Sequence, residues 1–321
     1  MADKLASRLL IQRLAPIYER IITGAYDPDQ DFDLLDAGIT QAEMLNDPLT
    51  EAYAKNILGA YYVMQEQYTD AIDIYHEVAE RYADGEDWEQ YVYAHNNIGT
   101  TYEKMGESQQ AIQAYQTIIA EYNFESVELI DVEAITALMD SVVNLGVVYV
   151  RQAEWAMAES TLKQAIALFG HPAVVDLQRE DLEDIVHYTY TLLSRVCLEQ
   201  NELQAAWDYN DDAWDMVDQF QSSYLAVASF LNEIRINVHH ADQTSAEENW
   251  HELESYLAEF DEGELTVSTP YYVAFAEYYL NKQQLEWAER HIERAVEALT
   301  LLKDEVSLAN LQPLIEKIRN S

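Results

Sequence analysis

The sequence predicts an all-α fold, a right-handed superhelical solenoid of about six to seven antiparallel helix hairpins followed by a C-terminal capping helix. One observation is a recurring spacing: Leu58-Gly59-x-x-Tyr62 is followed by Ala71 and Tyr75, with the glycine twelve residues before the alanine. The same spacing returns in Ile98-Gly99-x-x-Tyr102 with Ala111 and Tyr115, and in Leu145-Gly146-x-x-Tyr149 with Ala158 and Leu162. A second observation is the small number of helix breakers, nine glycines and six prolines in 321 residues. A fixed internal spacing in such a chain is typical of stacked helical hairpins.

The spacing has a physical explanation. On the first helix of each hairpin, the glycine lets the second helix approach closely, and the aromatic residue three positions later lies on the same face. On the second helix, the alanine lies where the two helices cross. The aromatic residue or leucine four positions later is expected to fill the remaining gap.

This pattern resembles the tetratricopeptide repeat family, whose hairpins carry a leucine–glycine pair, a tyrosine, an alanine and an aromatic residue at these offsets. A degenerate fourth unit is Leu193-Ser194-x-x-Cys197 with Ala206, and a later unit is Phe275-Ala276-x-x-Tyr279 with Ala288, Ile292 and Ala295. Between them, residues 224–260 leave room for one more hairpin, so the resemblance covers most of residues 50–300.

The repeats are longer than the family standard of about 34 residues. Gly59, Gly99, Gly146 and Ser194 are separated by 40, 47 and 48 residues. The additional residues are expected between hairpins or as helix extensions, at 84–87, 123–133 and 170–172. Long repeats of this kind are similar to those of Rap-type and PlcR-type bacterial peptide-sensing regulators and of some cargo-binding adaptors.

Three regions are expected: an N-terminal helical hairpin or cap over 1–50, a solenoid over 51–300, and a capping helix over 301–321. A solenoid needs a capping helix at each end. At both ends of this chain, apolar residues recur at the spacing of an amphipathic helix. The N-terminal helix carries Leu5, Leu9, Ile17 and Ile21, and the C-terminal helix carries Leu308, Leu311, Leu314, Ile315 and Ile318.

The chain is strongly acidic, with 59 acidic and 18 basic residues and a net charge of −41. Such a field repels the phosphate backbone, so direct nucleic-acid binding is not expected. Two explanations of the acidity stay open. One is solubility or adaptation to high internal salt, and the other is electrostatic steering of a basic peptide or protein partner.

No membrane partner is expected, because the sequence has no apolar run long enough to span a bilayer. The single cysteine, Cys197, occupies an aromatic slot of the fourth repeat and is expected in the core, which together with the lack of a leader predicts a cytoplasmic location. The pairs Tyr61-Tyr62 and Tyr278-Tyr279 are expected to pack between helices.

No cofactor and no metal site are expected. Asp208-x-Asn210-x-Asp212 begins like a calcium loop, but Ala213 and Gln219 stand where that loop needs glycine and glutamate. The series Asp27, Asp29, Asp31 and Asp33 fails in the same two places. His239-His240 lacks the spacing of zinc ligands.

A peptide-binding groove is expected on the inner face of the solenoid. This face belongs to the first helix of each hairpin, and its residues are found by helical spacing from the repeat glycine. Its predicted binding residues are Asn97, Lys104, Asn144, Arg151, Arg195, Asn232 and Arg235, and Tyr93, Thr100, Val147, Tyr188 and Thr191 accompany them. Asparagine amides pair with an extended backbone, and cations pair with carboxylates. In peptide-binding tetratricopeptide domains, asparagines and basic residues on these faces have this role, as the resemblance implies. The alternative is structural: asparagine before the Leu-Gly pair is common in the family, and a solvated pair with Glu103 or Glu154 would also account for Lys104 and Arg151.

The predicted function is therefore a non-catalytic scaffold, not an enzyme, that binds a protein or peptide in this groove and is a candidate peptide-responsive regulator. The alternative is a Rap-like phosphatase or another enzymatic regulator that acts through the N-terminal helices. It would present a glutamine such as Gln12 or Gln41 to a phospho-aspartyl partner. A homodimer also stays open.

Overall fold

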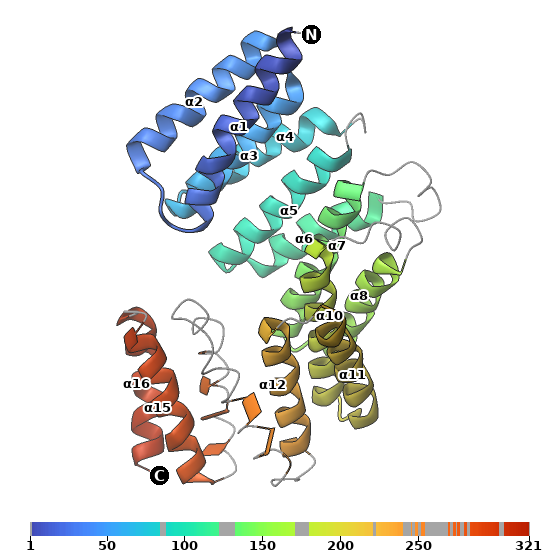
Figure 1. Ribbon diagram of the computed structural model, residues 1–321, viewed down its shortest axis with the longest axis vertical. Helices are drawn as coiled ribbons and strands as arrows, with labels where there is room; N and C mark the ends of the chain where they lie inside the picture. The colour runs from blue at the N-terminus through green and yellow to red at the C-terminus, as the bar shows by residue number, and fades with distance from the viewer. Residues whose placement is uncertain are drawn as a thin grey trace. The chain divides into compact units, whose positions relative to one another are not determined.

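The chain is helical throughout the part that the structure describes, and the all-α prediction is confirmed. The computed structural model describes residues 2–83, 88–121, 132–170, 180–220, 223–239, 283–301 and 305–320, with scattered residues between 245 and 280. These residues contain 13 bounded helices and no strand (Figure 1). The chain divides into two compact units, Met1–Gln200 and Asn201–Ser321.

Unit 1 is a stack of helix hairpins. Its helices are α1 (Ala2–Ile22), α2 (Pro28–Leu45), α3 (Pro48–Met64), α4 (Tyr68–Tyr82), α5 (Trp88–Met105), α6 (Ser108–Glu121), α7 (Val132–Arg151), α8 (Trp155–Phe169) and α10 (Glu180–Glu199). Within each hairpin the two helices pack together, and α1, α3, α5, α7 and α10 also pack in succession against one another. These first helices therefore form one layer, and the second helices α2, α4, α6 and α8 form the other (Figure 1).

Each repeat glycine admits a large side chain from the second helix, as the spacing predicts. A Cβ atom placed on Gly59 would lie 2.4 Å from the Tyr75 ring, and one on Gly99 would lie 2.4 Å from the Tyr115 ring. In the third hairpin, the corresponding distance from Gly146 to Leu162 is 2.6 Å. Because real Cβ atoms do not approach so closely, only glycine permits these helix pairs to pack this tightly.

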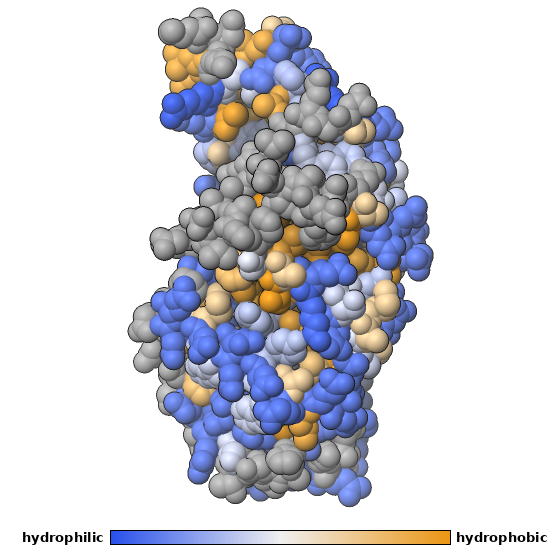
Figure 2. Space-filling model, turned by 90° about the vertical axis from the view of Figure 1, so that its right-hand side faces the viewer, coloured by the Kyte–Doolittle hydropathy of each residue, from blue (hydrophilic) through white to orange (hydrophobic). Residues whose placement is uncertain are grey.

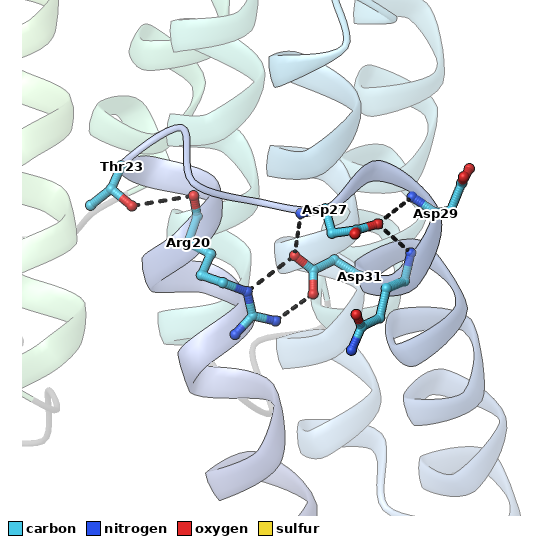
Figure 3. A network of polar contacts seen from close by, with 6 residues as sticks. Arg20, Thr23, Asp27, Asp29 and Asp31 are labelled. Atoms are coloured by element: carbon cyan, nitrogen blue, oxygen red, sulfur yellow. Dashed lines mark hydrogen bonds and ion pairs between the residues drawn. The ribbon is translucent and has the colours of Figure 1, made fainter.

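The first hairpin is closed by a polar network at the α1–α2 turn (Figure 3). Arg20 forms an ion pair with the buried carboxylate of Asp31, and its Nε donates to Asp31 Oδ2 over 3.2 Å. The backbone N–H of Asp27 donates to the same oxygen over 3.0 Å. Asp27 in turn caps α2, since its Oδ1 accepts from the N–H groups of Asp29 and Gln30. The hydrogen bonds from Arg20 lower the pKa of Asp31, so this carboxylate is ionised at neutral pH.

Unit 2 contains α11 (Leu203–Phe220), α12 (Ser223–His239), α15 (Leu285–Leu301) and α16 (Glu305–Arg319). Helix α11 packs on α12, and α15 packs on α16. The predicted late repeat supplies much of the core, because its alanines and aromatic residues are buried: Phe275, Ala276, Tyr279, Ala288, Ile292 and Ala295. The predicted capping helix corresponds to α16, whose Leu311, Ile315 and Ile318 are buried.

Some expectations lie outside the described residues. The additional residues expected at 84–87 and 123–131, His171 and Pro172, and most of the hairpin expected over 224–260, are among them. So is Tyr278, whereas Tyr61 and Tyr279 are buried as predicted. Cys197 is fully buried, which confirms its assignment to the core.

The described residues on the face drawn in Figure 2 are mostly hydrophilic. Figure 2 shows one face on which charged and polar residues dominate and apolar residues gather in separate patches. The large apolar side chains that stay exposed include Leu5, Leu9 and Met44 in the first hairpin. Among the described helices, none is long and apolar enough to cross a membrane.

Candidate functional site

The candidate site is the inner face of unit 1, carried by α5, α7 and α10. Hydrogen bonds between α5 and α7 fix how these helices align. Asn96 Oδ1 accepts from Ser141 Oγ and from Asn144 Nδ2, each over 3.2 Å. Near the C-terminal ends of the same two helices, Arg151 Nη1 lies 2.5 Å from Glu103 Oε2. The partners are 45 to 48 residues apart, close to the spacing of Gly99 and Gly146, so equivalent repeat positions lie side by side.

Two of the predicted binding residues of unit 1 have structural partners. Asn144 uses its amide to bind Asn96 on the preceding first helix. Arg151 pairs with Glu103, which is the solvated-pair alternative named for it above. Glu103 also accepts a hydrogen bond from the Tyr115 hydroxyl over 2.8 Å, so it joins α5, α6 and α7. Burial, and then the charge of Glu103, raises the pKa of Tyr115 and keeps the phenol protonated.

Three other predicted residues of unit 1 keep free polar ends. Within the described part of the chain, the side chains of Asn97, Lys104 and Arg195 have no hydrogen-bond or ion-pair partner. The hydroxyls of Thr100 and Thr101 donate to the backbone carbonyl of Asn97 and leave its side-chain amide unused. Lys104 is exposed, whereas Asn97 and Arg195 are half-buried.

The last two predicted residues belong to the other unit. Asn232 is buried and Arg235 half-buried on α12, and Arg235 Nη1 donates to Asn232 Oδ1 over 3.2 Å. The predicted set of seven is thus divided, with five residues in unit 1 and two in unit 2. Only the five of unit 1 can be assigned to one surface.

Asp140 is a residue of this face that the sequence did not single out. It lies on α7 one turn before Asn144, six residues before Gly146, where α5 has Tyr93 and α10 has Tyr188. Its carboxylate is half-buried and, among the described residues, has no hydrogen-bond or ion-pair partner. Burial raises its pKa to about 6. The signal in the sequence was a carboxylate at a repeat position where the neighbouring repeats have tyrosine.

His187, which precedes Tyr188 on α10, is a core residue. It is buried on α10 beside Tyr188, and burial lowers its pKa to about 4. The imidazole is therefore neutral at neutral pH.

The weak metal patterns gain no support from the fold. Asp208 and Asp212 lie inside α11, so their backbone is helical and does not form a calcium loop. His239 Nε2 lies 3.1 Å from Asn201 Oδ1, within unit 2. Neither arrangement brings several oxygen or nitrogen ligands to one point.

Comparison with known proteins agrees with the geometry. Tetratricopeptide repeat models match residues 50–120 and 141–173. The fold is that of a tetratricopeptide-like repeat protein. No curated protein matches the sequence.

Solved structures with this tetratricopeptide-like fold include Rap proteins. The apo form of RapI is 14% identical, with a TM-score of 0.67 over 93% of this chain and 99% of that one. Aspartyl phosphate phosphatase F from Bacillus subtilis is 13% identical, with a TM-score of 0.62 over 92% and 72%. The Rap conjugation gene regulator of the plasmid pLS20, in complex with the Phr* peptide, is 15% identical, with a TM-score of 0.53 over 86% and 73%. At these identities the likeness is one of fold.

Proposed function

We propose that this protein is a non-catalytic scaffold that binds an extended peptide segment on the inner face of unit 1. The observation that carries the proposal is the set of free polar ends on one helical layer, namely Asn97, Lys104, Asp140 and Arg195. Because no other described side chain engages these polar ends, they stay available to pair with a ligand. The likeness in fold to a Rap regulator in complex with a peptide supports the same class of ligand.

The ligand chemistry follows from the individual groups. The Asn97 amide offers a donor and an acceptor to a peptide backbone. Asp140, between the tyrosine positions of α5 and α10, suits a lysine or arginine of the peptide. Lys104 and Arg195 suit a carboxylate, either an acidic side chain or the peptide C-terminus. The bound segment would therefore carry both signs of charge.

The test is a selection of peptides from a displayed random library on the full chain, followed by affinity measurement by fluorescence polarisation. Selected peptides are expected to contain a basic residue, and Asp140→Asn should weaken them about tenfold because a charged hydrogen bond is lost. Arg195→Met should weaken peptides that carry an acidic residue or a free C-terminus. The matched control is Asp73→Asn, the same chemical change on an exposed residue of α4 in the other layer.

Two results would contradict the proposal. One is a library selection that yields no saturable binder. The other is an Asp140→Asn variant that binds the selected peptides as tightly as Asp73→Asn. Arg151→Met serves as a further comparison, because Arg151 already pairs with Glu103 and its loss should change peptide affinity little.

A phosphatase is the second candidate, because Gln12 is exposed on α1 and the fold resembles that of aspartyl phosphate phosphatase F. Gln41 is a weaker candidate for this role, since it accepts a hydrogen bond from Arg13 over 3.4 Å. Release of phosphate from acetyl-phosphate-charged response regulators, lost in Gln12→Ala, would support this function. An inactive wild type would exclude it for the regulators tested.

A further inference from the structure

A pocket of about 510 Å³ opens in unit 1 where α2 begins and α3 ends. Asp29, Phe32 and Asp33 line it from α2, Tyr61 and Tyr62 line it from α3, and Gln67 lies at the following turn. These residues belong to the first two hairpins, and none is among the inner-face groups of α5, α7 and α10.

The floor of the pocket is aromatic. The ring of Phe32 lies 5.7 Å from that of Tyr61 and 6.4 Å from that of Tyr62, tilted by 45° and 57°. Tyr61 and Tyr62 meet edge to face at 5.8 Å. The Tyr61 hydroxyl donates to the carbonyl of Pro28 over 2.8 Å, which holds its ring in place. Aromatic faces carry negative potential, so such a floor attracts cations.

The rim of the pocket is acidic. Asp29 and Asp33 lie one turn apart on α2, so their side chains share a face, and both are exposed. Neither carboxylate has a hydrogen-bond or ion-pair partner among the described residues. Figure 3 shows the Asp29 carboxylate turned away from the Arg20–Asp31 pair. The neighbouring arginine, Arg20, is already paired with Asp31.

The field at the pocket favours positive charge. The N-terminus of α2 contributes about half a positive charge, which is less than the two carboxylates supply. Burial, and then the charges of Asp70 and Asp36, raises the pKa of Tyr62. The phenol therefore stays neutral, and further carboxylates lie within electrostatic range of its ring.

We propose that this aromatic and acidic pocket binds the guanidinium group of an arginine side chain of a partner. A guanidinium is planar and weakly hydrated, so it stacks on a tilted aromatic floor while its N–H groups reach the rim carboxylates. An ammonium group is more strongly hydrated and gains less from the rings. The site is separate from the inner face, and its success or failure leaves the peptide proposal untouched.

The test uses ¹⁹F NMR of the full chain labelled with 4-fluorophenylalanine, since only seven phenylalanines contribute signals. Comparison with a Phe32→Leu variant assigns the Phe32 signal. N-acetyl-arginine methylamide should shift this signal saturably, with a dissociation constant on the order of 10 mM. The citrulline analogue has the same shape without the charge, and it should bind about fivefold or more weakly. The lysine analogue should fall between the two.

Variants test the two parts of the pocket. Tyr62→Leu removes a ring of the floor and should abolish saturation of the Phe32 signal by the arginine probe. The double variant Asp29→Asn with Asp33→Asn should weaken the probe about tenfold. The matched control, Glu43→Gln with Glu80→Gln, removes two exposed carboxylates from α2 and α4 and should leave the affinity unchanged. Circular dichroism checks that each variant is folded.

The proposal is overturned by an unshifted Phe32 signal, by equal binding of arginine and citrulline, or by an unchanged affinity in the double aspartate variant. Lysine binding as tightly as arginine would overturn the choice of guanidinium. The Asp140→Asn variant should bind the arginine probe at Phe32 as the wild type does. A Phe32 response that is lost with Asp140 would place the probe on the inner face and also contradict the proposal.

Discussion

At the scale of single residues, Asp140 is expected to reduce stability at neutral pH. Its pKa is raised to about 6, so between about pH 4 and 6 the native state holds a proton that the unfolded state has released. Stability contributed by this group therefore falls as the pH rises through that window. Asp140→Asn should raise the free energy of unfolding by about 1–3 kcal/mol at pH 7.5.

The same comparison at low pH is the check on this prediction. At pH 3.5, below the ordinary pKa of 3.8, Asp140 is mostly protonated in both states, so wild type and variant should unfold at nearly the same urea concentration. Asp73→Asn, on an exposed site, should show no such dependence. A gain that persists at pH 3.5 would mean that the introduced amide improves packing and that the charge of the native carboxylate is not responsible.

The repeat glycines give a second prediction at this scale. Gly99→Ala places a methyl group 2.4 Å from the ring of Tyr115, which is fully buried and cannot move aside freely. The expected loss is about 1–3 kcal/mol by thermal or urea unfolding. The control is Gly170→Ala, where an added Cβ meets only carbonyl oxygens at 3.6 and 3.8 Å and the backbone is right-handed helical. It should be neutral or stabilise by about 0.5–1 kcal/mol.

At the scale of elements, the α1–α2 hairpin depends on the pair between Arg20 and buried Asp31. The pKa of Asp31 is lowered, so its contribution is complete at neutral pH and is lost as the pH falls below its ordinary value. Asp31→Asn should cost about 1–2 kcal/mol at pH 7, since Arg20 is 38% exposed and partly screened. Amide hydrogen exchange should then quicken in α1 and α2 before other helices.

This loss should shrink as the pH falls below the ordinary pKa of 3.8, because the unfolded state then binds a proton that the native carboxylate does not. Asp29→Asn, in the same turn and without an ion pair, should cost no more than about 0.5 kcal/mol. Equal exchange rates in wild type and Asp31→Asn at pH 7 would show that the apolar contacts of Leu14 and Ile17 suffice to hold the hairpin.

The elements also show what the sequence could and could not predict. The spacing from Gly99 to Ala111 and Tyr115 lies within one hairpin, so it predicted which side chain fills the gap left by the glycine. The pair between Arg151 and Glu103 spans 48 residues and depends on how neighbouring hairpins align. Asp140 was one of 59 acidic residues, and although its repeat position can be read in the sequence, its half-burial and its lack of a described partner appear only in the structure.

At the scale of the whole molecule, the net charge of −41 predicts a dependence of stability on salt. Like charges repel in the compact state, and salt screens this repulsion with a Debye length of about 10 Å at 0.1 M. The free energy of unfolding should rise between about 10 mM and about 300 mM NaCl and then level off. Over this range the Debye length falls from about 30 Å to about 6 Å. Stability that is flat over this range would show that the charges are spaced too widely to repel.

The same titration separates the two explanations of the acidity. If the charge steers a basic partner, the association rate of peptides selected on this protein should fall steeply over the same salt range, while their dissociation rate changes little. If the charge serves solubility or adaptation to salt, the association rate should stay nearly constant while stability still rises. Stopped-flow measurement with a selected peptide gives both rates. A matched peptide with its basic residues replaced by glutamine sets the association rate expected without steering. If the association rates of the two peptides depend equally on salt, steering of a basic partner is excluded.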